Sequence, residues 1–342
     1  MRGPDPAAGK PAPAPAVRLL RLRHGGMPWA LAAESVREVV GTERLQRHPR
    51  ATAGAPYGWL LGEGEEVPVF LLAGERLATG TGAVVVVQLP AGPDCGLAVE
   101  AVEEVREEPM SRLRLLPALA AARRWVFPRV VLWDDGLALE IAPEAVPYLA
   151  GTAAHEEARR QRPTLAPPAG TPRFEVPPPR SSSSAGLCFF TLPGLPALGF
   201  ALPAAQVVEV MSSFTIRPVP GVPEPFLGLH AWRGEPLPVL DLARALGIPP
   251  AAPRAKRFAH GLVARAAHSQ QLLVFPLESM TGVRQGPFPY PPAGASPFPG
   301  ARHVLGSFAN GEQPLVVPDL DGLLRTSPAA TAVPTAASGG IP

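Results

Sequence analysis

Residues 228–242 read GLHAWRGEPLPVLDL, and this stretch decides the fold. Arg233 and Gly234 separate two short segments, which is the pattern of a β-hairpin with a tight turn. The second segment ends at Asp241, a residue type that favours the N-terminus of a helix. A strand, a tight turn, a second strand and a helix start within so short a stretch indicate a small, mainly β unit.

Short apolar or alternating runs bounded by Gly and Pro recur along the chain and predict further strands. These runs are residues 84–89, 136–141, 188–192, 198–202, 237–242, 272–277 and 315–317. Helices of one turn or little more are expected at 241–246 and 319–324, each opening with an aspartate. The chain has 47 prolines, and each costs roughly 3 kcal/mol or more inside a helix. The expected fold class is therefore mainly β, as small barrels or a sandwich.

The chain contains an internal duplication. WALAAESVREV at 29–39 aligns with FALPAAQVVEV at 200–210, and six of the eleven pairs are identical. GWLLGEGEEVPVFLLA at 58–73 aligns with GLHAWRGEPLPVLDLA at 228–243, with seven identities in sixteen. The two windows are offset by 171 and 170 residues, so they indicate one duplicated domain rather than a long repeat array.

Three segments lack the apolar residues needed for a core. Residues 1–16 and 327–342 are predicted to be disordered tails, and residues 151–185 a Pro- and Ser-rich linker. The remaining blocks, 17–150 and 186–326, are predicted to be two domains that fold independently.

Composition and motifs exclude several functional classes. The net charge of +2 and the scattered arginines give no basic patch for nucleic acid. No apolar stretch is long enough to span a membrane, and the N-terminal residues lack a signal peptide core, so a cytoplasmic location is expected. Phosphate-binding loops, dinucleotide-binding motifs and hydrolase motifs are absent from the sequence, and the histidine spacing fits no metal site. We therefore expect no enzyme, no cofactor and no metal. Cys95 and Cys188, which form no CxxC pair, are expected to be buried thiols.

The second block resembles the CheW family of chemotaxis coupling proteins. The family hallmark reads approximately G-x-x-N-L-R-G-x-x-x-P-V-x-D-L, and residues 228–242 match it without gaps. The matching positions are Gly228, Arg233, Gly234, Pro238, Val239, Asp241 and Leu242. VVEV at 207–210, IRPVPGVP at 216–223 and residues 305–324 resemble further family segments. The first block resembles the family more weakly, through residues 29–40, 95–105 and 130–146.

This resemblance implies both a fold and a function. Each domain is expected to be a pair of small, five-stranded, SH3-like β-barrels around a shared core. Members of the family are non-catalytic adaptors that link the cytoplasmic tips of methyl-accepting chemoreceptors to the regulatory domain of a CheA-type histidine kinase. The partner-binding residues expected by position, with Trp232 and Gly234 of the hairpin turn added, are Val207, Glu209, Gly228, Trp232, Arg233 and Gly234.

The sequence also departs from the hallmark. Ala231 and Trp232 replace its Asn-Leu pair, and Trp232 is predicted either to anchor a partner or to pack on its own barrel. In the first block, Glu63 stands at the arginine position and Leu71 at the aspartate position, so that block is predicted to have lost the contact. Two alternatives remain: a divergent CheW-like regulator with non-receptor partners in another signalling pathway, and an enzyme that uses a barrel cleft.

Overall fold

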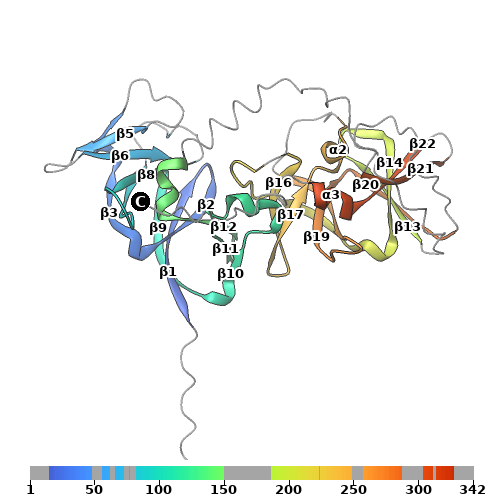
Figure 1. The fold of residues 1–342 in the computed structure, drawn as a ribbon, viewed down its shortest axis with the longest axis horizontal. Coiled ribbons are helices and arrows are strands. Elements are labelled where there is room, and N and C mark those ends of the chain that lie inside the picture. The colour runs from blue at the N-terminus through green and yellow to red at the C-terminus, as the bar shows by residue number, and fades with distance from the viewer. Residues whose placement is uncertain are drawn as a thin grey trace, which may run out of the picture.

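The computed structural model describes two β-rich halves. The described residues are 15–47, 56–61, 66–72, 77, 82–149, 186–222, 224–248, 257–286, 303–310 and 313–326. The first half, blue to green, and the second half, yellow to red, lie side by side along the long axis (Figure 1). The tails and linker predicted at 1–16, 151–185 and 327–342 fall almost entirely outside the described residues, although β1 already begins at Ala16.

The described part of the first half contains two six-stranded sheets. The first sheet has the order β10-β11-β12-β2-β1-β9, with β1 (Ala16–His24), β2 (Met27–Ala32), β9 (Ala101–Pro109), β10 (Leu113–Leu115), β11 (Arg129–Trp133) and β12 (Gly136–Ile141). The second has the order β3-β7-β8-β6-β5-β4, with β3 (Val36–Gly41), β4 (Leu45–Arg47), β5 (Gly58–Leu61), β6 (Glu66–Leu71), β7 (Ala83–Val87) and β8 (Cys95–Val99). The 3₁₀ turns are η1 (Ala33–Ser35), η2 (Thr42–Arg44), η3 (Met110–Arg112), η4 (Ala118–Arg123) and η5 (Pro143–Ala145).

The described part of the second half contains two five-stranded sheets. One has the order β20-β13-β14-β22-β21, with β13 (Leu187–Leu192), β14 (Leu195–Pro203), β20 (Ser279–Arg284), β21 (Val304–Asn310) and β22 (Gln313–Pro318). The other has the order β15-β18-β19-β17-β16, with β15 (Val207–Thr215), β16 (Phe226–Trp232), β17 (Glu235–Leu240), β18 (Arg257–Arg265) and β19 (Leu272–Leu277). The turn η6 (Ala204–Gln206) and the helices α2 (Leu242–Ala245) and α3 (Leu320–Thr326) complete this half.

The two halves share one topology, which confirms the duplication. The strand order β11-β12-β2-β1-β9 corresponds to β21-β22-β14-β13-β20, and β3-β7-β8-β6-β5 corresponds to β15-β18-β19-β17-β16. A parallel pair occurs at the same place in each sheet: β12 with β2, β22 with β14, β6 with β8, and β17 with β19. Even a local irregularity is repeated, because the register shifts between Val36 and Glu38 in β3 and between Val207 and Glu209 in β15. A β-bulge at the same position in both copies is a built feature of the fold.

The mainly β fold class and the predicted strands are confirmed, with small differences at their ends. The strand predicted at 237–242 ends at Leu240, because the Asp241 side chain accepts a hydrogen bond from the backbone N–H of Arg244 and so caps α2. The expected five strands per barrel are found in the second half. In the first half each sheet gains one edge strand, β4 or β10, of only three residues.

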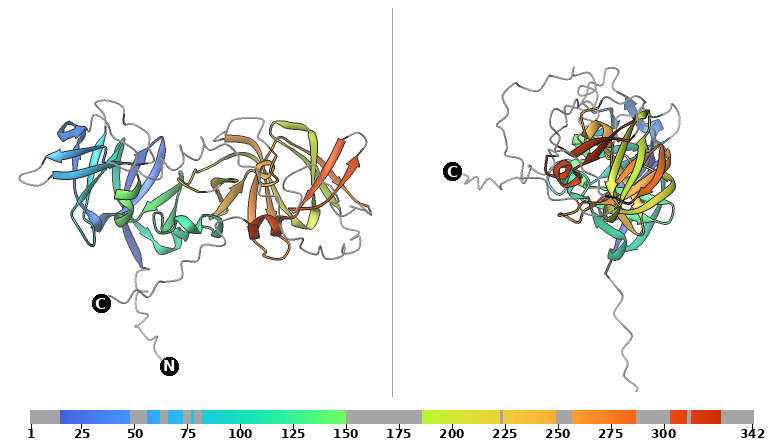
Figure 2. Two further views of the ribbon diagram at one scale, coloured as in Figure 1. Left: turned by 45° about the horizontal axis from the view of Figure 1, so that its top comes forward. Right: turned by 90° about the vertical axis from the view of Figure 1, so that its right-hand side faces the viewer.

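Each sheet curls into a small barrel with its own apolar interior (Figures 1 and 2). A larger cluster fills the space between the barrels and includes fully buried Phe127 of the first half and Phe190, Phe200 and Phe275 of the second. This single cluster contains buried residues from both halves. The two cysteines are free and buried, as expected. No helix among the described residues is long and apolar enough to cross a membrane.

Candidate partner-binding surface

The turn between β16 and β17 presents an arginine to solvent. Trp232 pairs with Glu235, and only Arg233 and Gly234 lie between them. Their φ angles are 48° and 79°, so both central residues are left-handed, which defines the hairpin turn that suits twisted strands. The hairpin prediction is confirmed. The Arg233 side chain is 69% exposed.

Glu209 lies on β15, the strand at the other edge of the same sheet, and its side chain contacts both Trp232 and Arg233. Its Oε2 accepts hydrogen bonds from Trp232 Nε1 at 3.0 Å and from Arg233 Nη2 at 2.8 Å. The Arg233 guanidinium also lies over the Trp232 ring, 4.8 Å from the centroid. Three of the predicted residues are thus held together by one shared carboxylate and a cation–π contact. The arginine is oriented before any partner arrives, which lowers the entropy cost of binding.

Trp232 packs on its own barrel, which is one of the two predicted alternatives. Its ring is half-buried and packs against the interior cluster of the second barrel, which includes Met211, Phe214 and Leu237. Its indole N–H nevertheless reaches Glu209 at the surface. The indole therefore connects the barrel interior to the exposed arginine.

Val207 and Gly228 lie away from this exposed cluster. Val207 is half-buried and packs against the cluster between the barrels. Gly228 is buried with a φ of 145°, and a Cβ there would lie 2.2 Å from the carbonyl oxygen of Arg217. Gly228 therefore shapes the approach of the loop at residues 216–222 from inside the domain.

Exposed valines next to Glu209 are a feature that the sequence reasoning missed. Val208 and Val210 are 37% and 42% exposed, and Val283 of β20 is 56% exposed. The equivalent positions in the first half are Val39 and Val105, at 45% and 48%. The sequence contains one signal for this surface, which is that Val39 and Val210 are identical in the aligned repeat. An apolar residue kept at a solvent-facing position in both copies indicates an interaction surface.

In the first half, these valines border a groove between the two barrels. Its volume is about 430 Å³, and it is lined by Val17, Leu20, Val36, Val39 and Val105 together with Ala16, Arg18, Ala33 and Glu34. The lining is largely apolar, with one arginine and one glutamate. The first half therefore presents an apolar surface even though its turn carries no matching arginine in the sequence.

The turn of the first half differs from its counterpart. Glu63, which stands at the arginine position, lies outside the described residues. Leu71, at the aspartate position, is half-buried against the interior cluster of its barrel. Of the apolar residues before the turn, Leu60 belongs to that interior whereas Leu61 is 44% exposed. The acidic cap of α2 thus has no equivalent at residue 71.

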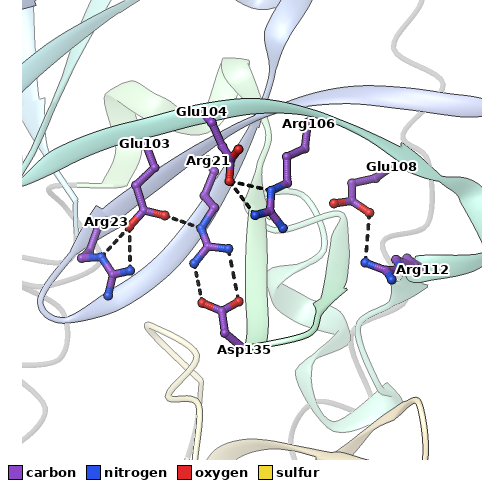
Figure 3. A network of polar contacts seen from close by, with 8 residues as sticks. All are labelled: Arg21, Arg23, Glu103, Glu104, Arg106, Glu108, Arg112 and Asp135. Atoms are coloured by element: carbon purple, nitrogen blue, oxygen red, sulfur yellow. Dashed lines mark hydrogen bonds and ion pairs between the residues drawn. The ribbon is translucent and has the colours of Figure 1, made fainter.

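A network of paired charges lies on the first barrel of the first half (Figure 3). Arg21 is buried and bonds both carboxylate oxygens of Asp135 as well as Glu103, while Arg23 also contacts Glu103 at 2.6 Å. Hydrogen bonding from Arg21 holds the pKa of Asp135 below its usual range. Burial alone would raise the pKa of Glu103, but the arginine contacts outweigh it and lower that pKa.

These carboxylates border a hollow of about 520 Å³, whose lining residues are Arg21, Glu103, Glu104, Arg106, Asp134 and Asp135. A general acid needs a raised pKa near the working pH, and the shifts of Asp135 and Glu103 go the other way. These two shifts therefore do not support a general acid at Asp135 or Glu103. Within the described residues, no group of three or more His, Cys, Asp or Glu side chains could hold a metal ion.

The chain thus has two small β-barrels in each half, and the second half carries a preorganised arginine hairpin. Residues 189–327 match the family model described as a CheW-like domain, so the second half of the chain carries a CheW-like domain. The first half repeats the topology of the second, which is consistent with two CheW-like domains.

One similar solved structure is the scaffolding protein TtCheW from Thermoanaerobacter tengcongensis. It is 20% identical, covers 41% of this chain and 91% of its own, and has a TM-score of 0.35. A search of curated proteins gives no match.

Proposed function

We propose that this chain is a tandem CheW-type adaptor that couples the cytoplasmic tips of chemoreceptors to the regulatory domain of a CheA-type histidine kinase. The observation that carries the proposal is the Glu209–Trp232–Arg233 cluster on the hairpin of a CheW-like domain. An adaptor of this kind does its work by docking and holds no substrate.

The proposed docking uses the hydrogen-bond donors of Arg233 that Glu209 leaves available. Its planar guanidinium presents several donors, of which Glu209 occupies one direction. A carboxylate or carbonyl group on a partner can accept from the remaining donors without displacing Glu209. The Trp232 ring beneath the guanidinium supplies an apolar floor that excludes water once the partner is seated.

The tandem arrangement adds a second docking surface. We propose domains at 17–150 and 186–326, joined by the linker 151–185. The first domain would use its apolar groove with Val39 and Val105, and the second would use the Arg233 hairpin. Two surfaces on one chain raise the local concentration of one partner near the other.

The second candidate function is regulation of another signalling pathway through non-receptor partners. The departure at Ala231 and Trp232 favours it, because the half-buried Trp232 and its bond to Glu209 give the turn a surface of its own. Both candidates use the same hairpin and differ in the partner that it binds.

The test replaces Arg233 with glutamate in the full chain. Arg233→Glu should weaken binding to a receptor tip or to the kinase regulatory domain by about 2–5 kcal/mol, or roughly 30- to 5,000-fold, if the arginine is buried on docking. Its thermal stability should stay nearly unchanged, because exposed ion pairs contribute little. Arg265→Glu, a reversal at another exposed arginine of the same domain, is the matched control. Isothermal titration gives the affinities, and wild-type affinity in Arg233→Glu would reject the proposed contact.

A further inference from the structure

Arg217 reaches out of its own domain. It belongs to the loop at residues 216–222 between β15 and β16, and its backbone pairs with Leu229 through hydrogen bonds of 2.7 and 2.8 Å. Its side chain leaves the second domain and lies over the Trp29 ring of the first, with the guanidinium carbon 4.3 Å from the centroid. Arg217 Nη2 donates to the carbonyl oxygen of Pro28 at 2.5 Å.

The surroundings of Arg217 are those of an interface anchor. The residue is only 5% exposed, and burial lowers its pKa to about 9. Its Nε and Nη1 make no hydrogen bond to any described residue, so the guanidinium is held by one carbonyl and one indole face, both from the first domain. A buried cation is costly unless it is compensated. The first domain therefore supplies the compensation that the second domain does not.

Two more arginines of the first domain extend this contact. Arg123, at the end of η4, donates from Nε to the carbonyl oxygen of Gly221 at 2.6 Å. Arg114 of β10 pairs with Glu235 at 3.1 Å, directly after the hairpin turn. Strand β12 lies beside β16, and the residues of both domains join in one apolar cluster that includes buried Val219 (Figures 1 and 2).

We infer that the loop at residues 216–222 and the strands β16 and β17 form a docking surface for a CheW-like barrel, and that the first domain of this same chain is its resident occupant. Three features identify the first domain as the occupant. They are the Trp29 indole that contacts Arg217, the Arg123 side chain that donates to Gly221, and the apolar cluster that contains residues of both domains. The two domains then act as one unit that does not depend on the linker. This inference rests on the contacts between the domains and not on the proposed function.

The experiment cuts the full chain at the linker. A specific protease site is inserted within 151–185, the purified protein is cleaved, and size-exclusion chromatography is run at about 10 µM. The two halves should elute together, because a dissociation constant below the loading concentration keeps most of them paired. Separation of the cleaved wild-type halves under these conditions would overturn the inference.

Variants assign the contact to Arg217. Arg217→Glu places a carboxylate against the Pro28 carbonyl and should weaken the pairing of the cleaved halves at least tenfold, whereas Arg265→Glu should leave it unchanged. Arg123→Ala alters only the first domain and should weaken the pairing less. If Arg217→Glu fails to fold, Arg123→Ala decides the question alone. Retained pairing in every variant would reject this surface as the docking site.

Discussion

Gly228 provides a sharp test of how the loop at residues 216–222 is held in place. Replacing it with alanine adds a Cβ that would lie 2.2 Å from the Arg217 carbonyl oxygen and 2.8 Å from its carbonyl carbon. Both neighbours are backbone atoms, so they can give way only if the loop moves. The φ of 145° is also one that a side chain disfavours.

The expected cost has two parts. A strained backbone conformation costs roughly 1–3 kcal/mol, and overpacking of a filled site costs roughly 1–3 kcal/mol more. Gly228→Ala should therefore destabilise the chain by about 2–6 kcal/mol. Because the Arg217 loop must shift, the same variant should also loosen the contact between the two domains.

Alanine variants of two other glycines measure the backbone strain and the steric overlap separately. Gly234 has a φ of 79° with open space around it, so Gly234→Ala carries the backbone strain alone. Gly58, the counterpart in the first domain, is not left-handed, but its Cβ would lie 2.3 Å from the Gln46 carbonyl oxygen, so Gly58→Ala carries the overlap alone.

Urea unfolding of the full chain, followed by circular dichroism, gives the three values from the midpoints and slopes. The expected order is Gly228→Ala most costly, with both other variants below it. If Gly228→Ala costs no more than Gly234→Ala, the loop yields freely and the reasoning about Arg217 is refuted.

Two further predictions follow from charges in the two domains. The buried Asp321 carboxylate accepts hydrogen bonds from the backbone N–H groups of His268 and Ser269, each at 2.9 Å; burial alone would raise its pKa, but these bonds lower it. Its contribution to stability should therefore be complete above the unfolded-state value near pH 4 and be lost as the pH falls below it. In Asp321→Asn, the free energy of unfolding should fall less between about pH 5 and 2 than it does in the wild type. An equal fall in both proteins would count against this prediction. Second, residues 186–326 expressed alone should retain binding to the receptor tip or kinase domain. Residues 17–150 expressed alone should not bind, because Glu63 replaces the arginine. Equal affinities of the two fragments in titration would contradict this asymmetry.

Local features of the fold could be predicted from the sequence because neighbouring residues encode them. The hairpin followed from Arg233-Gly234, and the start of α2 followed from Asp241, since turns and caps depend on a few adjacent residues. The duplication was visible because both copies keep the same apolar pattern. The edge strands β4 and β10 were missed because three residues are too few to show a period.

Contacts between distant segments could not be predicted in this way. Glu209 was expected at the partner surface, but only the curling of the sheet, which brings its edge strands β15 and β16 together, places Glu209 against Trp232 and Arg233. Arg217 lies in the segment 216–223 that resembles the family, yet its contact Trp29 is distant in the sequence and belongs to the other domain. Nothing in the local pattern of either residue indicates which surface it will meet. The expectation of two domains that fold independently came from the composition of the linker, which carries no information about how the domains pack.

The two copies differ most where side chains leave the shared apolar pattern. Arg21 and Phe189 occupy equivalent places, since each is paired with the matching alanine, Ala30 or Ala201, of the next strand. In the first domain the arginine lies over Trp133 and is neutralised by Asp135. In the second domain the phenylalanine fills the barrel interior instead. An ion cluster and an aromatic ring thus support the same barrel, because the fold requires the strand order and the filled interior rather than a particular side chain. The arginines at 217 and 233 lie outside the paired strands, in a loop and in a hairpin turn of the second domain. In the arrangement that we propose, domain docking and partner docking use neighbouring parts of one barrel in the second domain, and a partner that engages Arg233 meets the edge where Arg114 of the first domain holds Glu235.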